Sequence, residues 1–366
     1  MENHDLEINK SNRTTTSLSS ENTSITKMGT SGMSYNIFFP RAYIANFLAI
    51  VIMLSVFVDF AVTTRITGGS DPSIMKVGDM YYSTGSDGAS VYVHSSSTLE
   101  GLGADGSGHK VWSDNAGRGE VWAPEITTEG STTYIYFSAG TGANHRMYVI
   151  SASNPLGPYS SEQKLALPDD RWAIDGTFFN YGGQRWFVWS GWAGARARYI
   201  ISQPRESWEQ GDSPLVNEGP EAIIDPSGQL HIVYSANGSW DNKYCLADLR
   251  LRAGGDPTYV WDWYKSNGCL FGSHQDRMMS GWDATLYIDG PGHNTFALPN
   301  GDIGNSPGGT NRIPFVFHGV EKGTPYSWGN RAIFTGSFVW WSKTTYSRKN
   351  VPGDASNQGY SFKFFE

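Results

Sequence analysis

Four stretches of the chain share one pattern of apolar and polar positions. Each has a short apolar run, a turn that contains glycine, and a second run rich in aromatic residues. Two such runs joined by a glycine turn predict a β-hairpin. In each stretch the turn glycine lies seven residues after the first residue, and the stretches begin at Asp71, Ala123, Asp175 and Glu221. A hairpin-containing repeat of roughly 50 residues is typical of the blades of a β-propeller.

A fifth, less regular unit begins at residues 289–302 and continues to about Lys343. The five units predict an all-β fold, a five-bladed β-propeller, with the propeller domain at residues 66–350. The alternative is a β-sandwich, which would not keep the glycine at a constant offset over four units. In a propeller the innermost strand of each blade lines the axis. We therefore expect the residues that open these strands to meet at one end of the central channel.

The segment before the repeats differs in character. Residues 1–41 are rich in Ser, Thr and Asn and predict a disordered polar tail. Residues 42–62 are almost entirely apolar and predict a hydrophobic signal sequence or a signal anchor. Either outcome exports the remaining chain, so we expect an extracellular protein that is secreted or tethered. The chain would touch a membrane only through 42–62, if that segment is not cleaved.

Composition and charge narrow the class of partner. Charged residues make up 17% of the chain and aromatic residues 14%, and the formal net charge is −8. Because no run of Lys or Arg occurs, the electrostatic signature of nucleic-acid binding is missing. Many aromatic side chains in a weakly charged chain favour a neutral polyhydroxyl ligand that stacks on aromatic faces.

Two cysteines, Cys245 and Cys269, have no spacing typical of a zinc site. They form either one disulfide or two buried thiols, and export favours the disulfide. Export would also make the sequon Asn237-Gly238-Ser239 an acceptor for a glycan.

Carboxylates open the first strand in three of the units, at Asp71, Asp175 and Glu221, and Glu218 lies three residues upstream of Glu221. Taken singly, each is also typical of a turn. Together, at equivalent positions of different blades, they predict a carboxylate cluster at the channel mouth. Glycoside hydrolysis needs an ionised carboxylate that activates water and a protonated one that releases the leaving group. A third carboxylate keeps the acid protonated by raising its pKa. This chemistry requires no metal or organic cofactor.

Five short motifs occur in the same order along the chain. They are GGSDPSIMKVGDMYYSTGS, VWAPEI, AIDGTFF, NEGPEAI and GPGHNTF. With these motifs the sequence resembles glycoside hydrolase family 43, in particular its exo-acting α-L-arabinofuranosidase branch. The resemblance implies a five-bladed propeller and single-displacement hydrolysis with inversion at the anomeric carbon.

The resemblance also implies roles for the three carboxylates. Asp71 would be the general base, Glu218 the general acid, and Asp175 the residue that orients the acid and raises its pKa. The glycine offset selects Glu221 instead of Glu218. We follow the resemblance because the acid of the family precedes Gly-Pro, as Glu218 does. Glu221 remains the alternative acid and is otherwise expected to bind substrate.

Further residues match the family less specifically. His293, in Gly-Pro-Gly-His-Asn, resembles an axial histidine that often lies beside a calcium ion or a water cluster, although a core histidine is equally compatible. Trp122 would contribute to a sugar platform, or else to blade packing. Arg312 or Arg331 would contact a substrate hydroxyl; we choose Arg312.

The expected activity is release of terminal α-L-arabinofuranose from arabinan, arabinoxylan side chains or arabino-oligosaccharides. The alternatives with the same fold are a β-xylosidase and an endo-arabinanase. Two alternatives from other classes are a catalytically inactive carbohydrate-binding propeller and a membrane-tethered propeller that binds protein partners. Retention of all three carboxylates argues against both of the latter.

Overall fold

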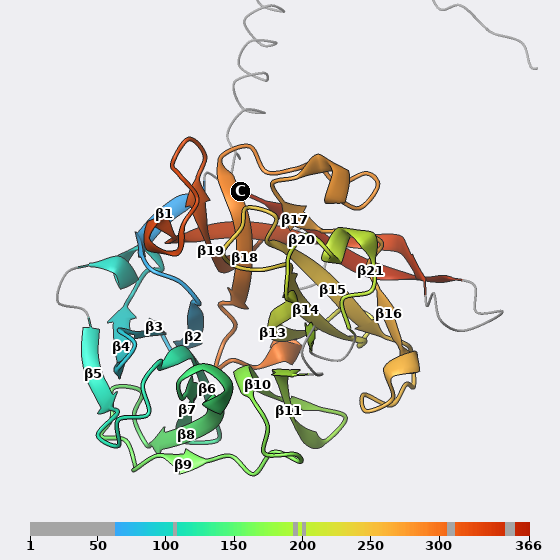
Figure 1. Cartoon of the computed structure of the whole chain (residues 1–366). Coiled ribbons are helices and arrows are strands. Elements are labelled where there is room, and N and C mark those ends of the chain that lie inside the picture. Colours follow the sequence, from blue (N-terminus) through green and yellow to red (C-terminus); the bar gives the residue numbers. More distant parts are fainter. Residues whose placement is uncertain (1–62, 105–107, 193–196, 200–202, 306–311, 348–355) are drawn as a thin grey trace, which may run out of the picture. The chain divides into compact units, whose positions relative to one another are not determined.

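A computed structural model describes residues 63–104, 108–192, 197–199, 203–305, 312–347 and 356–366 (Figure 1). The predicted polar tail 1–41 and apolar segment 42–62 lie outside the described residues. Within the described part of the chain, no helix has the length and apolar character needed to cross a membrane.

Two antiparallel four-stranded sheets follow the first strand of the described chain. Their first hairpins have two-residue turns, in which Gly78 and Gly130 adopt positive φ angles of 59° and 60°. Glycine reaches this conformation without steric cost, which explains the regular glycine of the sequence pattern. The first sheet contains β2 (Ser73–Val77), β3 (Met80–Ser86), β4 (Ser90–Ser96) and β5 (Gly108–Ser113), and the second contains β6 (Trp122–Glu129), β7 (Thr132–Ala139), β8 (Arg146–Ala152) and β9 (Gln163–Lys164).

The other strands of the described chain belong to one sheet of thirteen strands. Two of its links are short: β12 pairs in parallel with β13 at two positions, and β16 meets β20 at one. The sequence pattern predicted that each repeat forms a sheet of its own. In the structure, the later repeats are instead joined into one sheet. The strands are β1 (Thr64–Gly68), β10 (Ala173–Tyr181), β11 (Gln184–Trp192), β12 (Ala197–Tyr199), β13 (Leu215–Ile224), β14 (Leu230–Ala236), β15 (Cys245–Leu251), β16 (Trp263–Lys265), β17 (Phe271–Gly272), β18 (Ile288–Phe296), β19 (Ile313–Glu321), β20 (Ala332–Ser347) and β21 (Ser356–Phe365).

Short 3-10 helices occur only in connections between these strands within the described residues. They are η1 (Glu100–Gly103), η2 (Gly142–Asn144), η3 (Ser207–Glu209), η4 (Val260–Asp262), η5 (Gln275–Arg277), η6 (Ile303–Asn305) and η7 (Trp328–Asn330). This is the all-β architecture that the sequence predicted.

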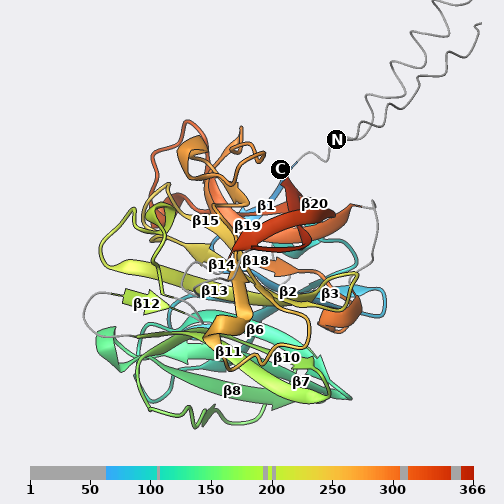
Figure 2. The same ribbon diagram turned by 90° about the vertical axis from the view of Figure 1, so that its right-hand side faces the viewer.

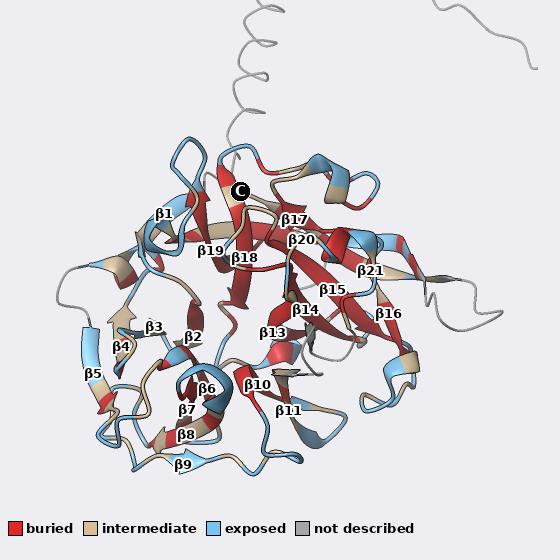
Figure 3. Ribbon diagram, in the orientation of Figure 1, coloured by how far each residue is buried: buried red, intermediate tan, exposed pale blue. Residues whose placement is uncertain are grey.

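The sheets are arranged around a common centre, and β2, β6, β10, β13 and β18 lie nearest to it (Figure 1). Each of these inner strands contacts the next one along the chain, and β18 contacts β2, so the circle closes. A closed circle of sheets with one inner strand each is a β-propeller. The outer strands β5 and β9 are largely exposed, whereas burial increases toward the inner strands (Figure 3).

The circle is closed by the start of the described chain. β1 precedes the first sheet in sequence but pairs antiparallel with β20, near the C-terminal end (Figure 2). Backbone pairing between the two ends of the propeller protects the edge of β20. The largest apolar cluster lies in the same half of the molecule and includes Tyr234, Phe315, Phe338 and Phe362.

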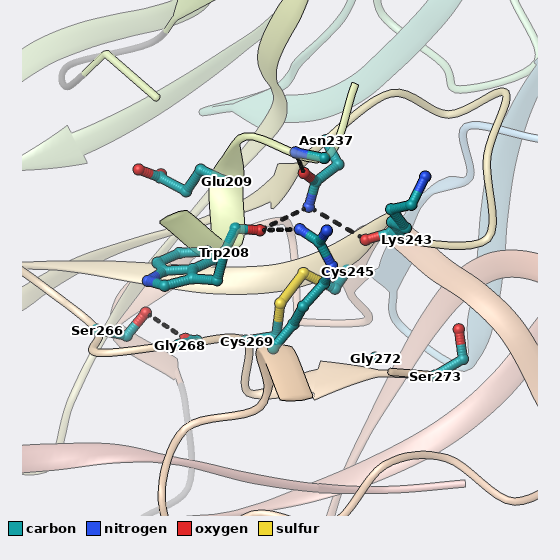
Figure 4. The surroundings of a disulfide bond; sticks show 12 residues. Trp208, Glu209, Asn237, Lys243, Cys245, Ser266, Gly268, Cys269, Gly272 and Ser273 are labelled. Atoms are coloured by element: carbon teal, nitrogen blue, oxygen red, sulfur yellow. Dashed lines mark hydrogen bonds between the residues drawn. A yellow bond between two sulfur atoms is a disulfide. The ribbon is translucent and has the colours of Figure 1, made fainter. Parts of the chain in front are cut away.

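A disulfide joins Cys245 of β15 to Cys269, which precedes β17 (Figure 4). Both cysteines are buried. Of the two alternatives that the sequence left open, the structure contains the disulfide.

Asn237 lies near this disulfide and does not fit the role of a glycan acceptor (Figure 4). Its side chain is buried, and its amide nitrogen donates hydrogen bonds to the carbonyls of Trp208 and Lys243, both at 3.1 Å. Because attachment of a glycan would require this nitrogen to be accessible, the sequon is structural.

Candidate active site

The inner strands share an irregularity near the end at which each begins. β-Bulges shift the pairing register of β6, β10, β13 and β18. One residue in each bulge has a positive φ, as does the residue two positions before β2. These residues are Asp71 (φ 54°), Ala123 (42°), Asp175 (54°), Gly219 (57°) and His293 (45°). Bulges re-aim side chains and are common beside active sites. The five residues are therefore equivalent positions of the repeat.

Alignment on the bulges corrects the register taken from the sequence. Glu218 lies one residue before the bulge position of β13, and Glu221 lies two residues after it. The glycine offset had matched Glu221 with Asp71, and this match is wrong. The turn 78–79 between β2 and β3 has two residues, whereas the turn 225–229 between β13 and β14 has five. The longer turn places its glycine farther from the bulge position, so the constant glycine offset selected Glu221 in β13.

The bulges bring together a group that we call the mouth cluster: Asp71, Asp175, Glu218 and His293. Nδ1 of His293 lies 3.2 Å from Oδ1 of Asp71 and 4.0 Å from Oδ2 of Asp175. The backbone N–H of Gly219 donates to Oδ2 of Asp175 at 3.0 Å. Asp175 is thereby bonded to the residue that follows Glu218. Three different inner strands and the segment before β2 supply these side chains, as the sequence predicted for the carboxylates.

Gly219 is required at its position for two reasons. Its φ of 57° is unfavourable for residues with a Cβ, and a Cβ there would lie 3.1 Å from the ring of His293. Only glycine lets β13 approach β18 this closely while its N–H reaches Asp175. This explains the glycine of Glu-Gly-Pro.

Charges within the mouth cluster stabilise one another. Burial lowers the pKa of His293, but Asp71 and Asp175 more than reverse this effect, and the pKa reaches about 9. Burial raises the pKa of Asp71, but the adjacent His293 overcomes it and holds the pKa well below its ordinary value. At neutral pH the pair is therefore an imidazolium and a carboxylate. An ionised carboxylate with one quarter of its side chain exposed can accept a proton from water.

His318 of β19 fixes the backbone of Asp71, and no pattern in the sequence indicated this residue. The N–H of Asp71 donates to Nδ1 of His318 at 3.0 Å. Burial lowers the pKa of His318 to about 4, so the ring is neutral and carries its proton on Nε2. This nitrogen is buried and has no hydrogen-bond partner among the described residues. Tyr244 stacks on the ring, with centroids 5.5 Å apart. His318 thus stabilises the unusual φ of the residue that we assign as base.

A second layer of side chains lies two residues after the bulge positions. Glu221 hydrogen bonds there with Glu125 and Thr295, and Thr177 Oγ1 donates to Glu125 Oε1 at 3.3 Å. Burial raises the pKa of Glu125 to about 7. Burial and the adjacent Glu125 raise the pKa of Glu221 well above its ordinary value. The two carboxyl groups therefore share a proton. Glu221 belongs to this axial layer, which corrects its prediction as the alternative acid or a substrate contact.

Trp122 occupies in β6 the position that Glu218 occupies in β13, one residue before the bulge. Its side chain is exposed, and one face stacks on His145 with the ring centroids 4.0 Å apart. His145 is buried and held by contacts to the carbonyls of Gly142 (2.9 Å) and Glu120 (3.2 Å). A fixed, exposed indole at this position has the form expected of a sugar platform.

Arg312 lies away from the mouth cluster. It precedes β19 at the end opposite His318, and Ile313 next to it pairs with Phe338. Its guanidinium packs 4.3 Å from the ring of Phe365. The choice of Arg312 as a substrate contact is therefore wrong. Arg331, the other candidate, lies at the correct end: the N–H of Gly69, two residues before Asp71, donates to its carbonyl at 3.1 Å.

The mouth cluster does not have the form of a calcium site. Across the described ranges, no group of three or more His, Cys, Asp or Glu side chains is arranged to hold a metal ion. Nδ1 of His293 faces the carboxylates of Asp71 and Asp175. Calcium prefers oxygen ligands in any case. The residues therefore do not fit a calcium ion bound directly by His293.

Comparison with known families matches this arrangement. Residues 66–343 match the sequence profile described as glycosyl hydrolases family 43. The chain belongs to this family.

The family 43 chain is 27% identical over 336 residues to alpha-L-arabinofuranosidase 43 of Humicola insolens, covering 78% of this chain and 67% of that protein. It is 26% identical over 203 residues to an extracellular exo-alpha-(1->5)-L-arabinofuranosidase of Streptomyces chartreusis, covering 49% and 58%. The chain thus spans between about half and two thirds of its curated relatives.

A solved structure, an alpha-L-arabinofuranosidase from Lactobacillus brevis, superposes on this family 43 chain with a TM-score of 0.62 and 23% identity. The superposition covers 76% of this chain and 93% of that one. At this identity the likeness establishes the fold alone, and it confirms an all-β propeller.

Proposed function

We propose that the protein releases terminal α-L-arabinofuranose by single-displacement hydrolysis with inversion at the anomeric carbon. Its substrates would be arabinan, arabinoxylan side chains or arabino-oligosaccharides. The observation that carries the proposal is the mouth cluster, in which Asp71 is held ionised by the imidazolium of His293 while Asp175 is bonded to the residue after Glu218.

Asp71 acts as the general base in this proposal. Its carboxylate takes a proton from water, and the water oxygen attacks the anomeric carbon. Inverting enzymes keep the two catalytic carboxyl groups roughly 6.5–9.5 Å apart, which leaves room for this water. His293 stabilises the carboxylate before the reaction, and His318 holds its backbone.

Glu218 acts as the general acid and protonates the leaving oxygen as the glycosidic bond breaks. Glu218 is mostly buried. Asp175 lies against the next residue and keeps Glu218 in position. By resemblance to the family, Asp175 would also raise the pKa of the acid.

The names of the relatives support arabinofuranose as the sugar. Another relative, 28% identical over 181 residues, is an arabinan endo-1,5-alpha-L-arabinosidase of Emericella nidulans, so endo action is the second candidate. We further propose that the protein is exported, because it contains a disulfide and resembles an extracellular enzyme. Residues 42–62 would then serve as signal or anchor.

We also propose five blades for the propeller. The circle of inner strands passes once through β2, β6, β10, β13 and β18. In this interpretation the thirteen-stranded sheet contains three blades that are linked by the short pairings of β12 with β13 and of β16 with β20.

The activity is tested by incubating the full chain with linear arabino-oligosaccharides and xylo-oligosaccharides and separating the products by chromatography. We expect arabinose alone, released one unit at a time. Internal arabino-oligosaccharide products would instead indicate endo action, and xylose would indicate a β-xylosidase. Absence of any sugar release would favour a binding protein.

A further inference from the structure

Asn217, the residue before the acid, is held from two sides. Its carbonyl oxygen accepts a hydrogen bond from Oγ of Ser190 in β11 at 3.0 Å. Its side-chain Nδ2 donates to Oε1 of Glu209 in η3, also at 3.0 Å. All three residues are buried, Ser190 and Glu209 completely. Hydrogen bonds that are shielded from water in this way are electrostatically stronger than exposed ones.

The place of Asn217 in β13 links these bonds to the acid. Asn217 and Glu218 form the regular pairs with β14 that precede the register shift of the bulge. On the other side of the acid, the N–H of Gly219 donates to Asp175 Oδ2 at 3.0 Å. Glu218 therefore lies between two residues that are each bonded to a side chain outside β13.

Glu209 is a buried carboxylate with hydrogen-bond donors on both oxygens. Oε1 also accepts from the hydroxyl of Tyr234 at 2.9 Å, and Oε2 accepts from the backbone N–H groups of Arg205 and Glu206 at 3.0 and 3.1 Å. Nζ of Lys265 lies 2.8 Å from each oxygen. Strands β14 and β16 and the start of η3 thus hold the carboxylate that anchors β13.

Stability alone does not explain a charged pair at this place. Glu209 is completely buried, and the side chain of Lys265 is 12% exposed. Removing two charges from water costs free energy, and apolar side chains of similar volume are often as stable or more stable. The pair instead provides a fixed acceptor for the amide of Asn217. Because successive side chains of a strand point to opposite faces, this contact acts on Glu218 through the backbone.

We propose that Glu209 and Asn217 are positioning residues for the general acid. Glu209 fixes the amide of Asn217, and Asn217 fixes the backbone from which Glu218 reaches the leaving oxygen. Asp175 fixes the following residue, so the bulge is held on both sides of the acid. The proposal rests on the proposed function and adds to it two residues outside the mouth cluster.

The test varies the leaving group, because a misplaced acid matters only where the leaving oxygen needs a proton. For each full-length variant, kcat is measured with 4-methoxyphenyl α-L-arabinofuranoside, which has a poor leaving group, and with the 2,4-dinitrophenyl glycoside, which has a good one. We expect Asn217→Ala to lower kcat for the methoxyphenyl substrate by about tenfold or more and to change the dinitrophenyl value by less than about twofold. KM should stay within about twofold for both substrates.

Two further variants complete the comparison. Ser190→Ala removes the other bond to Asn217 without adding volume, so it should act in the same direction and carries the test if Asn217→Ala fails to fold. His231→Gln is the matched control: His231 is buried in the same pair of strands, opposite Ile223, at the end away from Glu218. It should leave the ratio of the two kcat values unchanged. Equal losses on both substrates in Asn217→Ala, or an unchanged ratio, would overturn the positioning role.

A measurement without turnover separates this proposal from the proposed function. If the wild-type chain cleaves neither glycoside, the function fails, and carbodiimide labelling of carboxyl groups, read by mass spectrometry, decides the positioning role alone. Labelling of Glu218 should rise by about threefold or more in Asn217→Ala but not in His231→Gln, while labelling of Glu221 in the same strand stays constant. Equal labelling of Glu218 in the wild type and in Asn217→Ala would refute the role.

Discussion

Replacing His293 by Gln should move the acidic limb of the pH–activity profile to higher pH. His293 is a cation whose Nδ1 lies 3.2 Å from Asp71 Oδ1. At this distance the Coulomb attraction is about 5 kcal/mol with an effective dielectric constant of about 20. Desolvation offsets part of it. We therefore expect the pKa of Asp71 to rise by about 1–3 units, the range measured for carboxylates beside a cation.

The sign of the effect follows from the role of Asp71. A general base must be ionised, so activity falls as the pH drops through its pKa. In the wild type this pKa lies well below its ordinary value, so the acidic limb lies at low pH. Loss of the imidazolium raises the pKa, and the variant should lose activity at a pH where the wild type is still active.

The assay is kcat/KM for an aryl arabinofuranoside as a function of pH, because this parameter reports ionisations of the free enzyme. Gln keeps a hydrogen-bond donor without the charge, and His293→Lys restores a positive charge as a control. An acidic limb that stays in place in His293→Gln, with only a lower plateau, would refute the electrostatic role of His293. A limb restored toward the wild type by Lys would support it.

Three further predictions test other parts of the structure. Glu218→Gln should abolish hydrolysis of substrates with poor leaving groups, because it removes the general acid. Glu221→Gln should keep most of this activity. The reverse order of effects would move the acid to Glu221. Replacing both Cys245 and Cys269 by Ser should lower the free energy of unfolding by about 3 kcal/mol, since the bond closes a mid-sized loop, and unchanged denaturant unfolding would contradict this. His231 is buried between Asp248 and Asp225; burial lowers its pKa, but the two carboxylates raise it above the ordinary value. Its stabilising contribution is complete below about pH 6.5 and is lost as the pH rises through the folded-state pKa, so His231→Gln should flatten the alkaline decline of stability in denaturant titrations.

Much of the fold could be predicted because its signal is local. Each hairpin combines apolar runs with a glycine turn, and the two-residue turns at Gly78 and Gly130 need the positive φ that glycine adopts without strain. The pairing of β1 with β20 left no such signal, because the two strands are far apart in sequence. The same holds for the short pairings that join the later repeats into one sheet.

The site could be predicted only as far as its residues stand in the repeat. Asp71 and Asp175 occupy equivalent positions of the repeat. Their spacing in the sequence therefore predicted that they meet at one end of the channel. Glu221 was misaligned because the length of the turn after β13 cannot be seen from a glycine spacing. His318 lies in an apolar strand and acts through the backbone of another residue, so no pattern marks it. The sequence could not distinguish Arg312 from Arg331, because loop geometry does not follow from composition.

The central claim is inverting hydrolysis of terminal arabinofuranose with Asp71 as base. The most direct measurement is proton NMR of the first product formed from an α-linked arabino-oligosaccharide by the full chain, with Asp71→Asn measured in parallel. The account predicts that free β-arabinose appears first and then mutarotates, and that the variant forms no product while it still binds the sugar. Initial α-arabinose, or undiminished turnover by Asp71→Asn, would contradict it.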